Sequence, residues 1–271
     1  MHFSVLLSVY HKEKSDYLDE ALRSIANQSR KPDEIVLVED GKLTEELYAQ
    51  IDSWQERLGS VLRIVKLDEN VGLGEALNLG LDVCQYDWVA RMDTDDIALP
   101  SRFEKQLDFI QRQPDIDILG SWICEFESDP DKCDQIRKVP SAHQEIAHFA
   151  KYRNPLNHMT VIFKKEAVLD AGGYQPMPGF EDYYLWMRML GAGKRFANLP
   201  EVLVKARAGQ EMIRRRQGLG YALEEWQLQK AAYALGFWSD AELVRNIFVR
   251  VLPRLLPPSI TQKVYNALRK I

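Results

Sequence analysis

The chain has 271 residues, of which 46% are hydrophobic and 28% charged, a composition typical of a globular protein with one large domain or two small ones. Its formal net charge of -5 excludes a general affinity for nucleic acid. No apolar run reaches the roughly 18 residues that span a membrane, and no basic flank precedes the short apolar run at the N-terminus, so we expect a cytoplasmic protein. Because Cys84, Cys124 and Cys133 form no C-x-x-C pair and leave one cysteine unmatched, we expect neither a disulfide framework nor a zinc ribbon.

Strands and helices alternate through the first hundred residues. Short apolar runs predict strands at Phe3–Tyr10, Glu34–Val38, Leu62–Lys66 and Asp87–Met92. Apolar residues at helical spacing predict helices at Ser15–Ile25, Leu43–Leu58 and Gly74–Cys84. This alternation predicts an α/β fold with a mostly parallel central sheet.

The second half has a less regular pattern. Strands are predicted at Asp117–Phe126, Met159–Lys164 and Val202–Ala206, and helices at Ser101–Gln113, Lys165–Ala171 and Glu181–Leu190. The polar stretch from Glu127 to Pro155 carries no clear signal. From about Glu211 the chain has a helical pattern, which is broken at Gly236, Pro253 and Pro257-Pro258.

Three acids, Asp93, Asp95 and Asp96, follow the strand at Asp87–Met92. In parallel α/β sheets, ligands bind beyond the carboxyl ends of the strands. Carboxylates this close repel each other unless a cation or hydrogen-bond donors compensate them, and Mg²⁺ or Mn²⁺ with oxygen ligands does so while bridging to phosphate. The acids alone therefore indicate either a divalent-cation site or a solvated turn that caps the helix after Pro100.

Two other motifs each allow two interpretations. Gly72 and Gly74 open a helix after a strand, but Leu77 stands where a dinucleotide-binding fingerprint has its third glycine, which disfavours a dehydrogenase. Their backbone amides can still face a phosphate. The alternative is a simple glycine turn that binds no ligand. Glu181 and Asp182 begin an apolar helix, where the helix dipole alone favours acids; a carboxylate there can also act as a general base toward an alcohol.

Taken together, the motifs resemble the family 2 glycosyltransferases, inverting enzymes with the GT-A fold. The opening SVLLSVYHKEKSDYLDEALRSIANQSRKPDEIVLVEDG, then NVGLGEALNLG, then ARMDTDD followed by Pro100 and Arg102, are similar to that family's signatures in order and spacing. NPLNHMTVIFKKEAVLDAGGY and PGFEDYYLWMRM are similar to its acceptor half. The resemblance implies a GT-A domain over residues 1–210, with a nucleotide-sugar half at 1–100 and an acceptor half at 101–210, followed by a helical, basic C-terminal extension at 211–271.

The resemblance also implies a role for each matching residue. Tyr10 and Asp40 match the uracil contacts of a UDP-sugar, and Asp93 matches the ribose and diphosphate contact. The donor-binding set that it implies is Tyr10, Asp40, Asn70, Gly72, Asn78, Arg91 and Asp93. Asp95 matches the metal-ligand position for Mn²⁺ or Mg²⁺, with Asp96 as an alternative ligand. Asp182 matches the general base.

The function implied by the resemblance is an inverting, metal-dependent transfer of one hexose, galactose or glucose, from a UDP-sugar. The acceptor is a sugar on undecaprenyl diphosphate in bacterial O-antigen or exopolysaccharide synthesis, and the product is a β-linkage. Because the Q-x-x-R-W signature of processive synthases is absent, we expect a single addition. The alternatives are a polyprenyl-monophosphate glycosyltransferase and a catalytically silent sugar-nucleotide-binding subunit.

Charge is uneven along the chain, since residues 241–271 hold six basic side chains and one acidic one. Arg245, Arg250 and Arg254 alternate there with apolar residues, as in a basic amphipathic segment that lies on anionic headgroups. This pattern predicts a peripheral enzyme on the inner face of the cytoplasmic membrane; the alternative is a helix that packs on the core. Arg214, Arg215 and Arg216 are predicted to lie in a loop near the phosphates.

Overall fold

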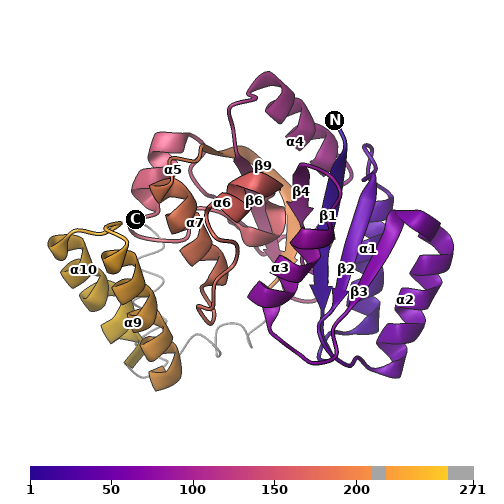
Figure 1. The fold of residues 1–271 in the computed structure, drawn as a ribbon, viewed down its shortest axis with the longest axis horizontal. Coiled ribbons are helices and arrows are strands. Elements are labelled where there is room, and N and C mark those ends of the chain that lie inside the picture. Colours follow the sequence, from indigo (N-terminus) through magenta and orange to yellow (C-terminus); the bar gives the residue numbers. More distant parts are fainter. Residues whose placement is uncertain (209–217, 256–271) are drawn as a thin grey trace.

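A computed structural model describes residues 1–208 and 218–255 of the chain (Figure 1). Its centre is one sheet, in which the strands follow the order β3-β2-β1-β4-β8-β6-β9-β5, and β7 pairs with β6. The strand bounds are β1 Phe3–Val9, β2 Glu34–Glu39, β3 Leu62–Lys66, β4 Trp88–Arg91, β5 Ile97–Ala98, β6 Ile118–Phe126, β7 Gln135–Arg137, β8 Ile162–Lys164 and β9 Phe196–Arg207.

The half of the sheet formed by β3, β2, β1 and β4 is parallel, with Val5 of β1 opposite Ile35 of β2 and Ala90 of β4. Strands β1, β2 and β4 are buried along almost their whole length because both faces are covered, as in α/β proteins generally. Beyond β4 the sheet becomes mixed: β8 runs antiparallel to β4 and β6, and β9 runs parallel to β6. All the parallel strand ends that carry the predicted acids therefore lie at one edge.

Helices cover both faces of the sheet (Figure 1). Side chains of α1 Ser15–Ala26, α2 Glu45–Leu58 and α4 Arg102–Arg112 pack in one apolar core with Val5 and Leu7. Side chains of α3 Leu73–Val83, α5 His143–Phe149, α6 Lys165–Asp170 and α7 Glu181–Gly191 pack in a second core with Leu6. Alternate residues of β1 thus enter opposite cores, as the two-residue period of a strand requires.

The C-terminal helices form a third layer beside α7, at the opposite end of the molecule from α2 (Figure 1). They are α9 Gly218–Ala234 and α10 Asp240–Asn246, followed by a π-helical turn at Ile247–Val251 and a 3-10 turn at Leu252–Leu255. A third apolar core joins α9 to α7 through Tyr183, Met187, Leu228, Ala232 and Trp238. None of the described helices is long and apolar enough to cross a membrane.

The α/β class and the helical C-terminal segment are confirmed, and two details differ from the expectation. The sequence patterns gave no sign of β5, β7 or α5, because two of these are very short strands and the third lies in the polar stretch. The last strand starts at Phe196, earlier than Val202, and passes a register shift opposite Ser121 and Trp122. The predicted domain boundary at residue 210 lies outside the described residues, as do Arg214, Arg215 and Arg216, and the two-part division stays a prediction.

The expectation about cysteines was wrong for one pair. Cys124 on β6 is joined to Cys133 by a disulfide that closes the loop between β6 and β7. The antiparallel pairing of these strands brings the two Cα atoms to 5.6 Å, a proximity that a spacing of nine residues does not reveal by itself. Cys84 is free and buried, and burial raises the pKa of its thiol to about 12.

Candidate active site

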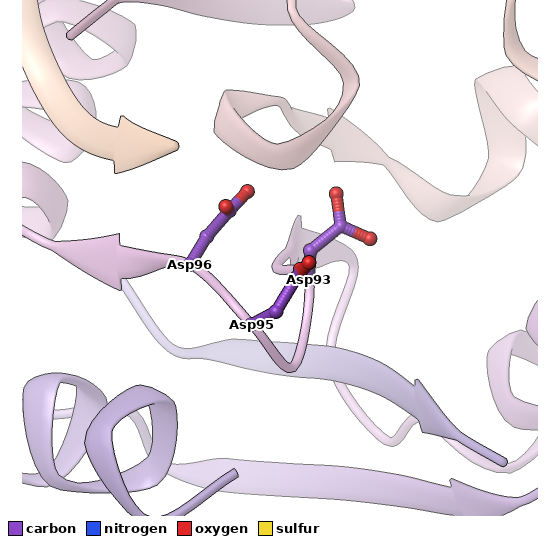
Figure 2. Close-up of side chains that lie close together, drawn as sticks. All are labelled: Asp93, Asp95 and Asp96. Carbon is purple, nitrogen blue, oxygen red and sulfur yellow. The ribbon is translucent and has the colours of Figure 1, made fainter. Parts of the chain in front are cut away.

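The three acids Asp93, Asp95 and Asp96 form a cluster in the turn between β4 and β5 (Figure 2). One ligand oxygen of each lies within 4.8 Å of those of the others. Asp93 and Asp96 point to the same side of the turn (Figure 2). The sequence neighbours are therefore also neighbours in space, and the turn presents three carboxylates to one point.

Burial and mutual repulsion both act on this cluster. Burial raises the pKa of Asp95 to about 7, and the charges of Asp93 and Glu13 add to the effect. Burial also raises the pKa of Asp96 well above its usual range, together with the charges of Asp95 and Asp93. Asp96 accepts a hydrogen bond from the Arg207 backbone amide through Oδ1 at 2.8 Å, but its buried Oδ2 has no hydrogen-bond partner. A buried, unpartnered carboxylate oxygen beside two further carboxylates is a donor set that fits Mg²⁺ or Mn²⁺.

A pair of arginines braces the strand that leads into the cluster. Arg91 is buried at the end of β4 and forms an ion pair with Asp93. Burial lowers the pKa of Arg91, but Asp93 outweighs that effect, so its pKa lies above the usual value. Arg102, also buried, donates to the Arg91 carbonyl oxygen at 2.7 Å, which fixes the backbone just before Asp93. One positive side chain thus lies against the cluster, where it can also face an anionic ligand.

The raised pKa of Asp95 predicts a pH-dependent response to divalent cations. Because this pKa rises on folding from 3.8 to about 7, the metal-free protein loses stability as pH rises between these values. A bound cation offsets both the burial and the repulsion of the charged carboxylates, and above the folded pKa it no longer competes with a proton. We expect Mn²⁺ to raise the melting temperature more at about pH 8 than at about pH 5. Thermal unfolding with and without Mn²⁺ at both pH values checks this, and an equal rise at both would contradict it.

Asp40 organises the loop that precedes α3. Its Oδ1 accepts from the Val71 amide at 2.7 Å, and its Oδ2 accepts from the Asn70 side chain at 2.9 Å and the Gly72 amide at 3.2 Å. Gly41 has a φ of +80°, and a Cβ there would lie 2.6 Å from the Asn70 backbone nitrogen. The structure therefore brings Asp40, Asn70 and Gly72 into one tight unit at the ends of β2 and β3.

Two other predicted donor residues are placed differently. Tyr10 is exposed at the end of β1, next to Asp40, whose amide donates to the Val9 carbonyl oxygen. Asn78 of α3 uses both ends of its amide on the backbone of Tyr174: its Nδ2 donates to the carbonyl and its Oδ1 accepts from the N–H, each at 2.8 Å. Asn78 thereby fixes the Tyr174 segment, and its direct contact with a donor stays a prediction.

Tyr174 packs in the second apolar core with side chains of α7. Its buried phenol interacts electrostatically with Arg91, Asp182 and Asp93. The Nε2 of His158 is 2.9 Å from the Tyr174 hydroxyl, and burial lowers the pKa of His158 well below its usual value, with Arg91 contributing. His158 is therefore a neutral, structural ring, and the charges of Asp93 and Asp182 both act on the Tyr174 phenol.

Asp182 lies in the first turn of α7 and is held by two donors. Its Oδ2 accepts from Asn154 Nδ2 at 2.6 Å, and its Oδ1 accepts from the Tyr183 amide at 2.7 Å. The preceding residue, Glu181, packs against Gly74, where an added Cβ would lie 3.4 Å from the Glu181 Cγ. The start of α7 thus adjoins the start of α3, which follows the Asp40 loop. Burial raises the pKa of Glu181.

Three residues of the site were not singled out from the sequence. Asn154 and Tyr174 belong to motifs quoted above, but nothing in their spacing connects them to Asp182. Glu13, whose Oε2 accepts from the Thr94 hydroxyl at 2.8 Å, belongs to the loop after β1. Its proximity to Asp95 follows only from the parallel pairing of β1 and β4.

Known proteins include clear relatives of this chain. Residues 4–170 match the family model described as Glycosyl transferase family 2. The chain belongs to this family. It is 42% identical over 268 residues to the amylovoran biosynthesis glycosyltransferase AmsE of Erwinia amylovora, with 99% of each chain covered. It is 41% identical over 264 residues to a UDP-Gal:alpha-D-GlcNAc-diphosphoundecaprenol beta-1,3-galactosyltransferase of Escherichia coli, with 97% of this chain and 95% of that one covered.

Two solved structures show the same fold as this family 2 glycosyltransferase. S. aureus TarS 1-349 in complex with UDP-GlcNAc has a TM-score of 0.67 at 20% identity, and the match covers 94% of this chain and 72% of that chain. The mannosyltransferase PcManGT from Pyrobaculum calidifontis, in complex with GDP-Man and Mn²⁺, has a TM-score of 0.61 at 17% identity and covers 100% of this chain and 81% of that one. The predicted family, enzyme class and GT-A fold are confirmed.

Proposed function

We propose that this glycosyltransferase moves one hexose, galactose or glucose, from a UDP-sugar to a sugar on undecaprenyl diphosphate, with inversion to a β-linkage. The observations that carry the proposal are the cluster of Asp93, Asp95 and Asp96 after β4 and the hydrogen-bonded Asp182 at the start of α7, since the charges of Asp93 and Asp182 both act on the buried Tyr174 phenol. Support for the donor and acceptor comes from the E. coli relative, whose name gives UDP-Gal and a GlcNAc-diphosphoundecaprenol. The name of the AmsE relative supports a role in polysaccharide synthesis.

The proposed donor site lies at the carboxyl ends of β1, β2 and β4. Tyr10 and the unit of Asp40, Asn70 and Gly72 would receive the uridine, with Asn78 supporting the loop. Asp95, with Asp96 as the alternative ligand, would hold Mn²⁺ or Mg²⁺, which when bound neutralises the charge that develops on the departing diphosphate, and Asp93 would contact the ribose and diphosphate. Arg91, buried and positive, stabilises the same anion from the protein side.

The proposed chemical step is a single displacement at the anomeric carbon. Asp182 accepts the proton of the acceptor hydroxyl as its oxygen forms the new bond to the anomeric carbon. The bond from that carbon to the diphosphate oxygen breaks on the opposite face, and its electron pair leaves with UDP. Asn154 orients the Asp182 carboxylate for this role by donating to Oδ2. An α-linked donor therefore gives a β-glycoside.

A donor and acceptor screen tests the proposal. The full chain is incubated with Mn²⁺, a GlcNAc-diphosphate-lipid analogue and, in separate reactions, UDP-Gal, UDP-Glc, UDP-GlcNAc and GDP-mannose; free nucleotide and product mass are measured. We expect UDP release with a product heavier by one hexose. A product formed from GDP-mannose on a polyprenyl monophosphate would favour the second enzymatic class, and UDP binding without any product across the acceptors would favour a silent binding subunit.

We also propose that the enzyme works on the inner surface of the cytoplasmic membrane, where a lipid-linked acceptor is held. The arginines expected to meet lipid headgroups are directed inward: Arg245 and Arg250 donate to carbonyl oxygens of Lys151 and Tyr152. The described part of the segment instead exposes three apolar side chains four residues apart, Val244, Phe248 and Leu252. Such side chains, the largest of them 63% exposed, suit insertion at a lipid interface.

Replacing Phe248 by glutamate is expected to reduce binding to vesicles of phosphatidylglycerol and phosphatidylethanolamine several-fold, since it places a charge in the apolar stripe. Activity on a short-chain soluble acceptor should persist. Vesicle flotation measures the binding, and Ile136→Glu, a change at an exposed apolar residue of β7, is the matched control. Vesicle binding by Phe248→Glu equal to that of the unaltered chain would contradict this surface.

A further inference from the structure

Two arginines of the C-terminal segment meet a buried glutamate of α9. Glu225 has no exposed surface, and its Oε1 lies 2.8 Å from Arg250 Nε while its Oε2 lies 2.6 Å from Arg254 Nη2. Burial raises the pKa of Glu225, but the two guanidinium charges outweigh burial and its pKa lies below the usual value. The glutamate is therefore ionised and fixes the position of the Arg250 guanidinium.

The other side of that guanidinium faces the helix that carries Asp182. Arg250 Nη1 donates to the Tyr152 carbonyl oxygen at 3.0 Å and to the Tyr183 hydroxyl at 3.2 Å, and its guanidinium lies 5.1 Å from the centre of the Tyr183 ring. The Tyr183 hydroxyl in turn donates to the Ala150 carbonyl oxygen at 2.5 Å. Arg250 thus touches both α7, at the residue directly after Asp182, and the segment that follows α5.

The segment that follows α5 is held at three consecutive carbonyl groups. Those of Ala150 and Tyr152 bind Tyr183 and Arg250, and that of Lys151 accepts from Arg245 Nη2 at 2.8 Å. The carbonyl oxygens of Lys151 and Tyr152 accept from arginines and cannot shift without losing charge-assisted hydrogen bonds. The backbone entering Asn154, two residues further on, is therefore fixed relative to α7.

Asn154 transmits this placement to the proposed base. Its Oδ1 accepts from the Leu156 amide at 3.3 Å, which turns its Nδ2 toward Asp182 Oδ2 at 2.6 Å. The amide group is thus oriented by its own loop, and the loop is oriented by the C-terminal arginines. A displacement of the loop moves the donor away from the carboxylate.

The packing of the C-terminal helices on α7 depends on apolar contacts and not on the Glu225 ion pairs. The third apolar core joins them through residues that include Met187, Leu228 and Trp238. A buried ion cluster generally adds little net stability compared with apolar side chains of similar size. The Glu225 cluster is therefore better explained by the geometry it imposes than by the free energy of folding that it adds.

We propose that Arg250 is a positioning residue for Asp182. Held by Glu225, it fixes the loop at Ala150–Tyr152 against Tyr183 and so keeps the Asn154 amide on the carboxylate that accepts the proton. The C-terminal segment is then a structural part of the active site. This inference rests on the proposed role of Asp182 as general base.

The first test compares full-length variants in steady-state kinetics with the UDP-sugar and lipid-diphosphate acceptor analogue of the screen. Arg250→Met is expected to lower kcat about tenfold or more while the KM for the UDP-sugar stays unchanged, since misplacement by a fraction of an ångström has large effects on rate. Glu225→Gln, which releases the guanidinium from the other side, should give the same pattern. Lys230→Met, at an exposed position of α9, is the control and should leave both constants unchanged.

A double-mutant cycle with Asn154→Ala separates positioning from a general loss of structure. If Arg250 acts through Asn154, the double variant should have the kcat of Asn154→Ala alone, because the contact to be positioned is already lost. Multiplying losses, or a normal kcat in Arg250→Met, would overturn the inference. If the melting curve shows that Arg250→Met is not folded, Arg250→Lys replaces it in both tests, with the same expected results. An active Asp182→Asn enzyme would refute the base assignment itself, whereas an inactive one beside a fully active Arg250→Met refutes only the positioning role.

Discussion

Replacing Asp182 by asparagine is expected to lower kcat by about 10²- to 10⁴-fold, the range typical of a lost general base. The amide keeps the size of the carboxylate and can still contact Asn154, but it cannot take the proton of the acceptor hydroxyl. Binding of UDP in the presence of Mn²⁺ should remain, because the proposed donor contacts lie at the carboxyl ends of β1 to β4 and on α3, not on α7. Single-turnover kinetics and UDP titration calorimetry measure the two effects separately.

Glu181→Gln is the matched comparison for this experiment. Glu181 is also a carboxylic acid in the first turn of α7, and burial raises its pKa. It therefore differs from Asp182 mainly in position. We expect it to retain most of its turnover. If Glu181→Gln were inactive and Asp182→Asn active, the base would have to be assigned to Glu181.

Asp95→Asn is expected to have two opposite effects. Without metal, the variant should be more stable than the unaltered chain above about pH 7, because one of three repelling acids is removed from the cluster. Its activity in Mn²⁺ should fall by about 10²-fold or more, since a proposed metal ligand is lost. Thermal unfolding with and without Mn²⁺ and steady-state kinetics measure both.

Asp108→Asn, a change at an exposed acid of α4, controls for the altered net charge and should change neither quantity. A stabilised Asp95→Asn that still gains melting temperature from Mn²⁺ as strongly as the unaltered chain would show that Asp95 is no ligand. Asp96 would then remain the candidate, since its Oδ2 is buried without a hydrogen-bond partner.

Local patterns were sufficient to predict most of the fold. The strands β1, β2 and β4 are buried along almost their whole length because helices cover both faces of the sheet, and their short, mainly apolar runs are recognisable one by one. The strand pair β6 and β7 was not recognised as a pair because β7 has three residues, of which Ile136 is exposed. Its disulfide was missed for the same reason: it depends on a pairing that no local signal announces.

The candidate site divides in the same way. Asp93, Asp95 and Asp96 are close in sequence, so one turn suffices to bring them together, and the cluster was predictable. Asp182 and Asn154 are 28 residues apart and meet only through the packing of α7. Arg250 and Arg254 were expected to face a membrane, but they pair with Glu225 of α9. A helical pattern shows the spacing of charges and does not show which residue of a neighbouring helix they meet.

The third apolar core bears on how the protein can be shortened for biochemical work. Tyr183 and Met187 lie on a face of α7 that α9 and Trp238 cover. All described strands of the sheet and the proposed catalytic and metal-binding acids precede this cover in the sequence, since the last strand ends at Arg207. A polypeptide that ends near Arg207 would expose this apolar face to solvent, and we expect it to self-associate. A shortened polypeptide for expression should therefore retain α9, Trp238 and the helical turns up to Leu255.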